Sequence, residues 1–462
     1  MKKQNRIAIF NILSVILLNG ISFFTAPIFF NLLGDSGYGI LKIYNIWVSI
    51  IAIVFPLQTQ GTLVNARVEY PETEQNRYQS AVMGLALVAF LAFSAVVLVF
   101  IDPLSRLLHL SPFLVCLMLV QAFGTFCVGF LNTKFVYEFK AGRNMATSLT
   151  ITLTSLALSV FLILQLPHET RYYGRIIGIA ATYGCIGIPA CIYILAKGKT
   201  FFHREYWKFC IVLAIPTIFH NLSDLILGQS DQLMLQYMIG EAEVGRYGLA
   251  WNFANVLFVI FGALNKTWAP FFFDEMKQEK RDAMLKKTVN FLELFTVLAV
   301  GFILLSKEVF RVYVHRDIPE CTIVLPIFVA GYYLNFLCTF PVNFEYYHKK
   351  TKVVAGVTIG AGLLNIGLNY ILIGKLGMIG AALATAMSHG VQLLLHYGYT
   401  RYILGKKDYP FGFSLWWKYA AAFFGMLVFV YAASDLWILR WGVGAVIGVW
   451  ELLRFRKRKV VI

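Results

Sequence analysis

The chain has 462 residues, of which 59% are hydrophobic and 14% charged, and its mean hydropathy is +0.69. Globular domains are about 45–50% apolar and about 25% charged, so this composition excludes a soluble domain and is typical of a polytopic membrane protein. The net charge of +16 does not indicate a nucleic-acid partner, because the basic residues lie between apolar segments and not on one patch.

Apolar segments long enough for the roughly 20 residues of a spanning helix follow one another along the whole chain. The hydrocarbon forces the backbone to close its own hydrogen bonds, and the alternation of barrel strands is absent. We therefore expect an all-α polytopic membrane protein with about 14 transmembrane helices, and we interpret the apolar run after MKKQNR as a retained first helix. The predicted spans are 7–31, 39–60, 79–101, 112–136, 145–166, 174–196, 208–239, 246–270, 288–306, 322–345, 353–374, 377–400, 413–434 and 437–453.

The chain contains an internal repeat. Residues 10–60 match the segment that begins at Pro216, with NLLGDSGYG set against YMIGEAEVG, so Gly34 corresponds to Gly240. A second match sets GRIIGIAAT against GMIGAALAT, whose small residues suit close helix packing. The two copies of the repeat are separated by six spans. Because six is an even number, both copies face the same way in the membrane and form a parallel repeat. We expect two six-helix lobes, residues 1–206 and 207–404, and a terminal helix pair with a basic cytoplasmic tail, residues 405–462.

Lys and Arg are distributed unevenly between the two sets of loops. Of the 40 basic residues, 28 lie in the loops on the side of the termini, and 9 lie in the opposite loops, among them Arg175. Basic loops stay in the cytoplasm, so this distribution predicts that both termini are cytoplasmic. It also accounts for the net charge without a polyanionic partner.

The span at residues 208–239 carries a polar stripe. His220, Asp224 and Asp231 lie at i, i+4 and i+11, which places them on one face of a straight helix. A carboxylate at membrane depth costs about 2.5–3.5 kcal/mol, so two of them need a polar cavity or partners. We interpret the stripe as an ion-coupling site; the alternative is a hydrogen-bonded seam between helices.

The second span of each repeat copy carries polar residues as well. Lys42 and Asn45 share one face of the span at 39–60, and Asn252, Asn255 and Lys266 lie on the span at 246–270. We interpret them as substrate-cavity residues that line a cleft if these faces converge. The alternative for each lysine is that its ammonium extends to the membrane surface. Two further carboxylates, Glu293 and Glu345, lie near the ends of their spans, and we interpret both as interfacial.

Signals of catalysis are weak. The chain has no Walker A loop, no HExxH and no GxSxG on a strand–helix turn, so we expect no catalytic residue, and transport driven by a gradient or the membrane potential. Its seven cysteines are scattered through apolar segments without a CxxC or Cys/His cluster. This pattern predicts neither a metal site nor a disulfide framework, and no cofactor is expected.

The turn motifs LLGDSGYG and MIGEAEVGRYG, the segment SDQLMLQYMIG and the late GKLGMIGAALAT resemble the polysaccharide transporters of the multidrug/oligosaccharidyl-lipid/polysaccharide (MOP) superfamily, of the type of Wzx-like oligosaccharide flippases. The resemblance implies two lobes around a central cavity with alternating access. It implies a polyprenyl-diphosphate-linked sugar repeat unit as substrate, moved to the outer leaflet for O-antigen, capsule or exopolysaccharide synthesis. It further implies the bacterial cytoplasmic (inner) membrane as location, and membrane lipids, a polysaccharide polymerase and glycosyltransferases as partners.

Two other functions stay open from the residues. A cation-coupled drug or metabolite antiporter of the same superfamily would show a carboxylate-rich first lobe, and no acidic residue lies clearly at mid-membrane in the first six spans. A membrane-embedded sugar polymerase or glycosyltransferase would need a large external loop or an acidic catalytic motif, and the sequence has neither.

The terminal helix pair begins with SLWWKYAAAFF, and we expect it to flank a groove for the polyprenyl tail.

Overall fold

The computed structural model describes residues 2–278, 281–404 and 410–458, with side chains from Leu17 onward except at positions 224, 227, 281, 283, 413 and 455–458. Every element in this described part is helical. Ten helices are long and apolar enough to cross a membrane, or eleven if the two bent parts of α8 form one span. The predicted all-α polytopic membrane protein is confirmed.

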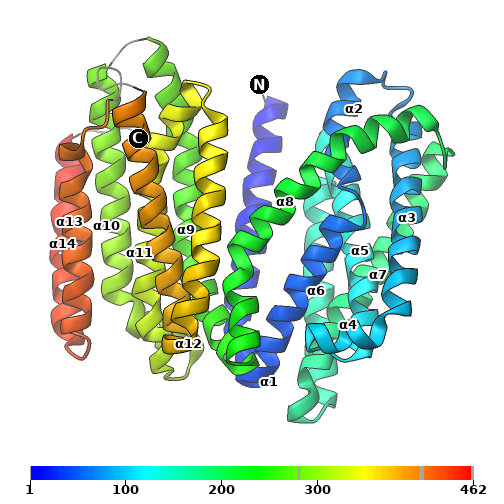
Figure 1. Ribbon diagram of the computed structural model, residues 1–462, viewed down its shortest axis with the longest axis horizontal. Helices are drawn as coiled ribbons and strands as arrows, with labels where there is room; N and C mark the ends of the chain where they lie inside the picture. Colours follow the sequence, from blue (N-terminus) through cyan, green and yellow to red (C-terminus); the bar gives the residue numbers. More distant parts are fainter. Residues whose placement is uncertain (1, 279–280, 405–409, 459–462) are drawn as a thin grey trace. The chain divides into compact units, whose positions relative to one another are not determined.

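The elements follow one another along the chain as shown in Figure 1. They are α1 (Lys2–Val54), η1 (Thr59–Thr62), α2 (Leu63–Glu69), α3 (Gln75–Val99), α4 (Ile101–Leu108), α5 (Pro112–Tyr137), α6 (Ala141–Gln165), η2 (His168–Thr170), α7 (Arg171–Gly198), α8 (Arg204–Met238), α9 (Glu241–Lys277), α10 (Arg281–Val314), α11 (Pro319–Tyr347), α12 (Thr351–Gly398), η3 (Tyr399–Ile403), α13 (Phe413–Ala432) and α14 (Trp437–Arg458).

Two of these helices each contain two predicted spans, separated by a glycine. Gly34 in α1 has φ 71° and ψ 172°, and Gly377 in α12 has φ 56° and ψ −134°. Glycine adopts positive φ without the penalty that a Cβ imposes, so the chain can turn back at these points, as the ribbon of α1 does in Figure 1. Gly240, the repeat partner of Gly34, also has positive φ, 134°, where α9 begins.

The described chain divides into two compact units, Met1–Leu233 and Met234–Ile462. We refer to them as unit 1 and unit 2. In unit 1, α7 packs against α3, α5 and α6, and α1 packs against α5, α6 and α7. In unit 2, α11 packs against α9, α10 and α12, and α13 and α14 pack against α10. The lobe boundaries that the repeat suggests, after residues 206 and 404, stay predictions.

Glycines allow the closest helix contacts of unit 1. A Cβ on Gly124 of α5 would lie 2.3 Å from the carbonyl oxygen of Tyr183 on α7, and one on Gly187 of α7 would lie 2.5 Å from Gly124 Cα. Only glycine fits such a crossing. The small residues of the second repeat motif serve the same purpose, because a Cβ on Gly380 would lie 2.2 Å from the Leu372 carbonyl oxygen within α12.

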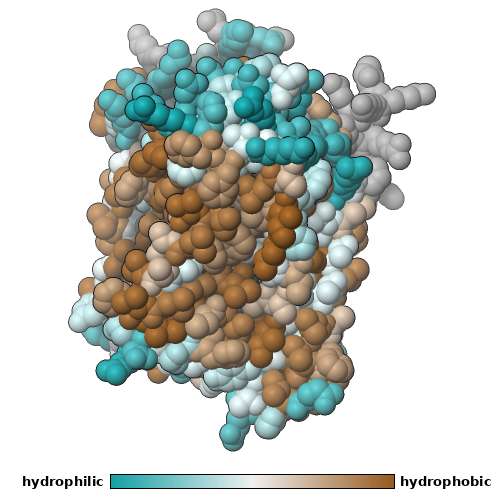
Figure 2. Space-filling model, turned by 90° about the vertical axis from the view of Figure 1, so that its right-hand side faces the viewer, coloured by the Kyte–Doolittle hydropathy of each residue, from teal (hydrophilic) through white to brown (hydrophobic). Residues whose placement is uncertain are grey.

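One face of unit 1 is apolar over most of its height. Figure 2, which looks onto this side, shows hydrophobic residues over the middle of the surface and hydrophilic residues at both ends. Leu91 of α3 and Leu164 of α6 are 60% and 65% exposed. Such an apolar band suits a bilayer and would be a liability in water.

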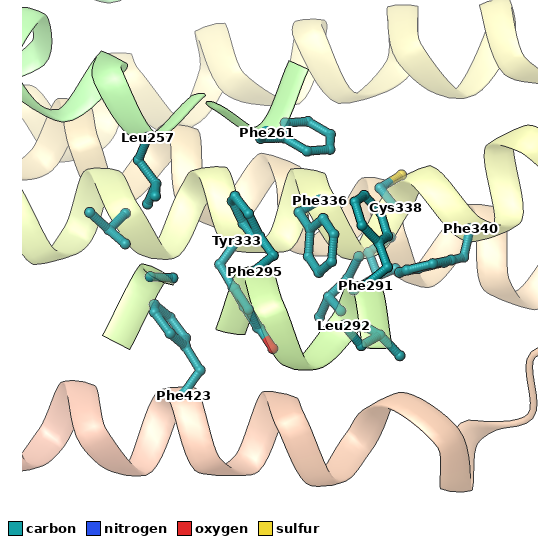
Figure 3. Packing of buried hydrophobic residues seen from close by; sticks show 14 of the residues in the cluster. Leu257, Phe261, Phe291, Leu292, Phe295, Tyr333, Phe336, Cys338, Phe340 and Phe423 are labelled. Atoms are coloured by element: carbon teal, nitrogen blue, oxygen red, sulfur yellow. The ribbon is translucent and has the colours of Figure 1, made fainter. Parts of the chain in front are cut away.

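The core of unit 2 is aromatic. Figure 3 shows side chains of α9, α10, α11 and α13 that meet in one cluster. The Tyr333 and Phe423 rings stack with centroids 4.2 Å apart, and the Phe295 and Phe336 centroids are 4.3 Å apart. Aromatic pairs add roughly 0.5–1.5 kcal/mol each beyond the area they bury. The packing of Phe423 joins α13 to this core.

Candidate functional site

Lys42 and Asn45 lie on the second half of α1, after the Gly34 break, and both side chains are half-buried. The Lys42 ammonium lies 5.4 Å from the centroid of the Tyr38 ring, within cation–π range. The Asn45 side-chain oxygen, Oδ1, accepts a hydrogen bond of 3.4 Å from the side-chain Nε2 of Gln121 on α5. This half of α1 therefore brings a cation and an amide into unit 1.

Arg175 is a second cation of unit 1; the charge distribution counts it with the loop residues, although it lies at the start of the predicted span 174–196. The structure places Arg175 in α7, with its guanidinium 3.9 Å from the centroid of the Phe29 ring. Its Nη1 donates to Ser159 Oγ at 2.9 Å and to the Ser155 carbonyl oxygen at 3.4 Å. Its Nε is buried without a hydrogen-bond partner among the described residues. None of the partners described for Arg175 is a carboxylate.

The two cations lie on helices that pack against each other, Lys42 on α1 and Arg175 on α7. Tyr38, which is 4% exposed, lies under Lys42, and its ring centroid is 5.5 Å from that of Phe30, the neighbour in sequence of the Phe29 that lies under Arg175. We call Lys42, Arg175 and Tyr38 the cationic cluster of unit 1. One sequence signal could have found Arg175: the repeat match sets GRIIG against GMIG, which places this arginine opposite Met378. A charge in one copy of the repeat, where the other copy is apolar, indicates a role beyond packing.

The predicted cavity residues of unit 2 all lie on α9. Asn252 and Asn255 are half-buried, and Lys266 is exposed. Lys266 follows Asn255 by 11 residues, about three turns, so the two lie on the same side of the helix. The structure therefore groups the predicted residues by unit, Lys42 with Asn45 and Lys266 with the two asparagines. Their convergence on one cleft stays a prediction.

The predicted ion-coupling residues lie on α8, and α8 is not straight. Its segments Arg204–Ser223 and Gly228–Met238 meet at an angle of 54°. The exposed His220 precedes this bend, and Asp231 follows it, so the projection onto one straight helix does not apply. Asp231 is 7% exposed, and its Oδ1 accepts a hydrogen bond of 2.8 Å from the Gln232 backbone N–H. The side chain of Asp224 lies outside the described residues.

Two carboxylates interpreted as interfacial are buried in unit 2. Glu345 of α11 is 0% exposed, and both its carboxylate oxygens lie 2.9 Å from His396 Nδ1 on α12. Glu293 of α10 is 6% exposed and pairs with Arg454 of α14. A buried charge needs such a partner, and neither partner is close in sequence, so only the packing reveals them.

A buried cation also lies at the end of α5 in unit 1. Lys134 is 2% exposed, donates to Asn76 Oδ1 at 3.0 Å and to Gln79, and forms a salt bridge of 3.0 Å with Glu138. Burial raises the pKa of Glu138, but the ammonium groups of Lys140 and Lys134 outweigh it, so this pKa lies below its usual value. The Lys134 ammonium is satisfied within the protein, which favours a structural role.

No group of three or more His, Cys, Asp or Glu side chains suited to a metal occurs in the described part of the chain.

The described chain has ten helices long and apolar enough to span a membrane, arranged in two helical units, which define a multi-pass membrane protein. The chain belongs to the polysaccharide biosynthesis protein family, whose sequence model matches residues 6–276. The family that the resemblance of the motifs indicated, one of polysaccharide biosynthesis, is thereby confirmed.

Three comparisons place the chain among known proteins. It is 21% identical over 226 residues to an uncharacterized membrane protein of Haemophilus influenzae, covering 47% of this chain and 55% of that one. It is 21% identical over 392 residues to a probable low-salt glycan biosynthesis flippase of Haloferax volcanii, covering 82% of this chain and 80% of that one. Its fold is similar to the inward closed conformation of the lipid II flippase MurJ, with a TM-score of 0.72, 15% identity, and coverage of 98% and 99%.

Proposed function

We propose that this protein is a flippase that moves a polyprenyl-diphosphate-linked oligosaccharide repeat unit across the cytoplasmic membrane, for the synthesis of a cell-surface polysaccharide. Its family, its fold and the flippase named among its relatives support this proposal. In the proposal, residues 1–206 and 207–404 form the two alternating lobes and residues 405–462 the terminal pair. The chain acts as a transporter and not as an enzyme. Its partners are lipid-linked glycan and membrane lipids, with a polymerase and glycosyltransferases working beside it.

The cationic cluster of unit 1 is the observation that carries the proposal. A diphosphate cannot enter a membrane protein unpaired, since the Born cost of a bare charge is of order 20 kcal/mol before relaxation. Arg175, over the Phe29 ring, offers a fork of N–H donors that suits phosphate, and Lys42, over the Tyr38 ring, offers a point charge. Asn45 lies about one turn after Lys42 on the same face of α1. In the proposal, its amide binds a hydroxyl of the sugar that is attached to the bound diphosphate.

The residues of α9 suit the loading step. Lys266 is exposed near the end of this helix that the charge distribution places toward the cytoplasm. We assign it the capture of the diphosphate, with Asn252 and Asn255 binding sugar hydroxyls. Lys42 and Arg175 receive the diphosphate in the outward-open state.

The proposal is tested with purified protein in liposomes. The probe is a short polyprenyl-diphosphate-linked N-acetylglucosamine with a fluorophore on the sugar, and the readout is its protection from membrane-impermeant dithionite. A flippase equilibrates the probe between leaflets faster than empty liposomes do. Equal rates would contradict the proposal, and proton-driven exchange of an organic cation without flipping would favour the antiporter.

We further propose that His220, Asp224 and Asp231 bind a proton or sodium ion that drives transport. Asp224→Asn and Asp231→Asn are each expected to abolish the part of the flipping rate that responds to an imposed ion gradient. The reason is that a neutral amide, unlike a carboxylate, does not bind and release a proton or sodium ion. Flipping is measured with and without the gradient. If both variants respond to the gradient as the parent does, the stripe is only a packing seam.

The charge distribution supports an orientation with both termini in the cytoplasm. Reporter fusions after Gly34, Gly240 and Asp435 are expected to be active outside the cytoplasm, and fusions at either terminus inside it. The measurement is paired alkaline phosphatase and green fluorescent protein activity in a bacterial host. An external C-terminus would contradict the fourteen-span arrangement.

A further inference from the structure

Glu345 and His396 form the most deeply buried acid–base pair described in unit 2. Both side chains are 0% exposed, and His396 Nδ1 lies 2.9 Å from each carboxylate oxygen of Glu345. Glu345 belongs to α11 and His396 to the second half of α12, two helices that pack along each other. In the described part of the chain, the Glu345 carboxylate bonds to no other side chain.

The second ring nitrogen of His396 is open to a proton. A carboxylate only accepts hydrogen bonds, so Nδ1 carries the hydrogen that Glu345 accepts. Nε2 is buried and has no hydrogen-bond partner among the described residues. With Nε2 unprotonated, the pair carries a net charge of −1; one proton on Nε2 makes an imidazolium and brings the net charge to zero. A buried charge without a compensating partner is costly.

The surroundings of the pair contribute little compensating charge. Cys338 lies two turns before Glu345 on the same face of α11, and the Glu345 backbone carbonyl accepts a hydrogen bond of 2.9 Å from the Lys350 N–H. From η3, Thr400 Oγ1 donates to the His396 carbonyl at 2.9 Å, and Arg401 Nη1 donates to the Tyr397 hydroxyl at 3.1 Å.

The neighbouring helices contribute rings at this end of unit 2. From α13, Trp416 packs edge-on against Tyr397, with centroids 5.6 Å apart. From α9, the Phe273 ring stacks on the Tyr347 ring, with centroids 6.4 Å apart. Cys338, Tyr347, Tyr397 and Arg401 are therefore the titratable side chains that the described contacts place around the pair.

We propose that Glu345 and His396 form a proton-binding site of unit 2, and that its occupancy locks α11 against α12 during the transport cycle. This inference rests on the proposed flippase function. Proton binding at Nε2 completes an ion pair that bridges the two helices. Proton release leaves a buried carboxylate that is no longer compensated, so the helices separate or water enters, and the contact between them loosens. This proton site is distinct from the stripe on α8.

A second histidine of α12 provides a matched control. His389 lies two turns before His396 on the same face of the helix, and its Nδ1 lies 3.4 Å from Asn335 Nδ2 and 3.3 Å from Gln392 Oε1. Its described partners are neutral amides, so its protonation does not relieve a buried negative charge. A substitution of His389 by Gln should leave the behaviour of the pair unchanged.

The test is hydrogen–deuterium exchange of the full-length protein in liposomes, followed by mass spectrometry between about pH 5 and about pH 9, a range wide enough for histidine side chains in general to gain or lose a proton. After correction for intrinsic exchange, amides in segments 340–347 and 396–403 are expected to exchange roughly tenfold faster at the alkaline end, because opening the contact becomes about 1.4 kcal/mol easier. The segment 112–137 of unit 1 should show no such change.

The variants separate proton binding from simple packing. Glu345→Gln, and the double variant Glu345→Gln with His396→Gln, carry no buried carboxylate, so exchange in both segments should no longer depend on pH. The double variant serves where the single one does not fold. His389→Gln should retain the pH dependence of the parent. A parent without pH-dependent exchange in these segments, or neutral variants that keep it, would overturn the proposal.

A transport measurement then links the site to function. With the fluorescent probe described above, an imposed pH gradient should accelerate flipping by the parent and by His389→Gln, and should have no effect on the Glu345→Gln variant. Failure of the parent to flip the probe would count against the proposed function alone, since the exchange measurement does not depend on it. A normal response of the neutral variants to the gradient would overturn the coupling role of the pair.

Discussion

Removing the charge of Arg175, Lys42 or Lys266 is expected to slow flipping of the diphosphate-linked probe by about tenfold or more for each residue, since a charge-assisted hydrogen bond contributes about 1.5–3 kcal/mol. Lys266→Gln should weaken binding from the cytoplasmic side, and Lys42→Gln should slow release on the opposite side. Arg175→Gln should affect the same step as Lys42→Gln, because the helices that carry the two cations, α7 and α1, pack against each other in unit 1. Initial flipping rates at several probe concentrations distinguish binding from release.

Two matched variants control this prediction. Lys418→Gln removes an exposed lysine from α13, another predicted span, and should leave flipping unchanged. Arg175→Lys keeps the charge but loses the planar fork, so it should retain more activity than Arg175→Gln. If all three charge-removing variants flip the probe at the parental rate, the diphosphate is bound elsewhere and the assignment is wrong.

Phe423→Ala is expected to destabilise unit 2 by about 3–5 kcal/mol, the range for truncating a buried aromatic side chain. Phe423 is 0% exposed and stacks on Tyr333 with ring centroids 4.2 Å apart, in the core that α9, α10, α11 and α13 share. The measurement is titration of the purified protein with dodecyl sulfate. Val428→Ala, on the same helix at a side chain that is 69% exposed, should change stability by less than about 0.5 kcal/mol.

This packing changes how the proposed groove for the polyprenyl tail can be tested. Deleting residues 413–462 would remove Phe423 and Val430 from the core, together with the partner of Glu293 on α14. Such a deletion should destabilise unit 2 and not merely abolish flipping. If Phe423→Ala is as stable as the parent, the terminal pair is independent of the core. Deletion of residues 413–462 would then test the groove for the polyprenyl tail without destabilising unit 2.

Local features of the fold could be predicted from the sequence, because they depend on residues close together in the chain. Composition and the length of the apolar segments identify the spanning helices, since the bilayer imposes the same requirement on every span. The glycines of the repeat mark the turns: Gly34 and Gly240 both have positive φ, as a tight reversal between helices requires. Lys42 could be identified as a half-buried cation because a lysine within an apolar run is conspicuous.

Only the tertiary structure decided which polar groups meet. Glu345 and His396 are 51 positions apart, and nothing in either local sequence distinguishes a buried pair from two interfacial side chains. Arg175 lies near the start of its helix, where loop residues are common, yet its neighbours Phe29 and Ser159 come from two other helices. The cost of a buried charge is set by its partners, and the partners are set by helix packing, which hydropathy along one chain does not encode.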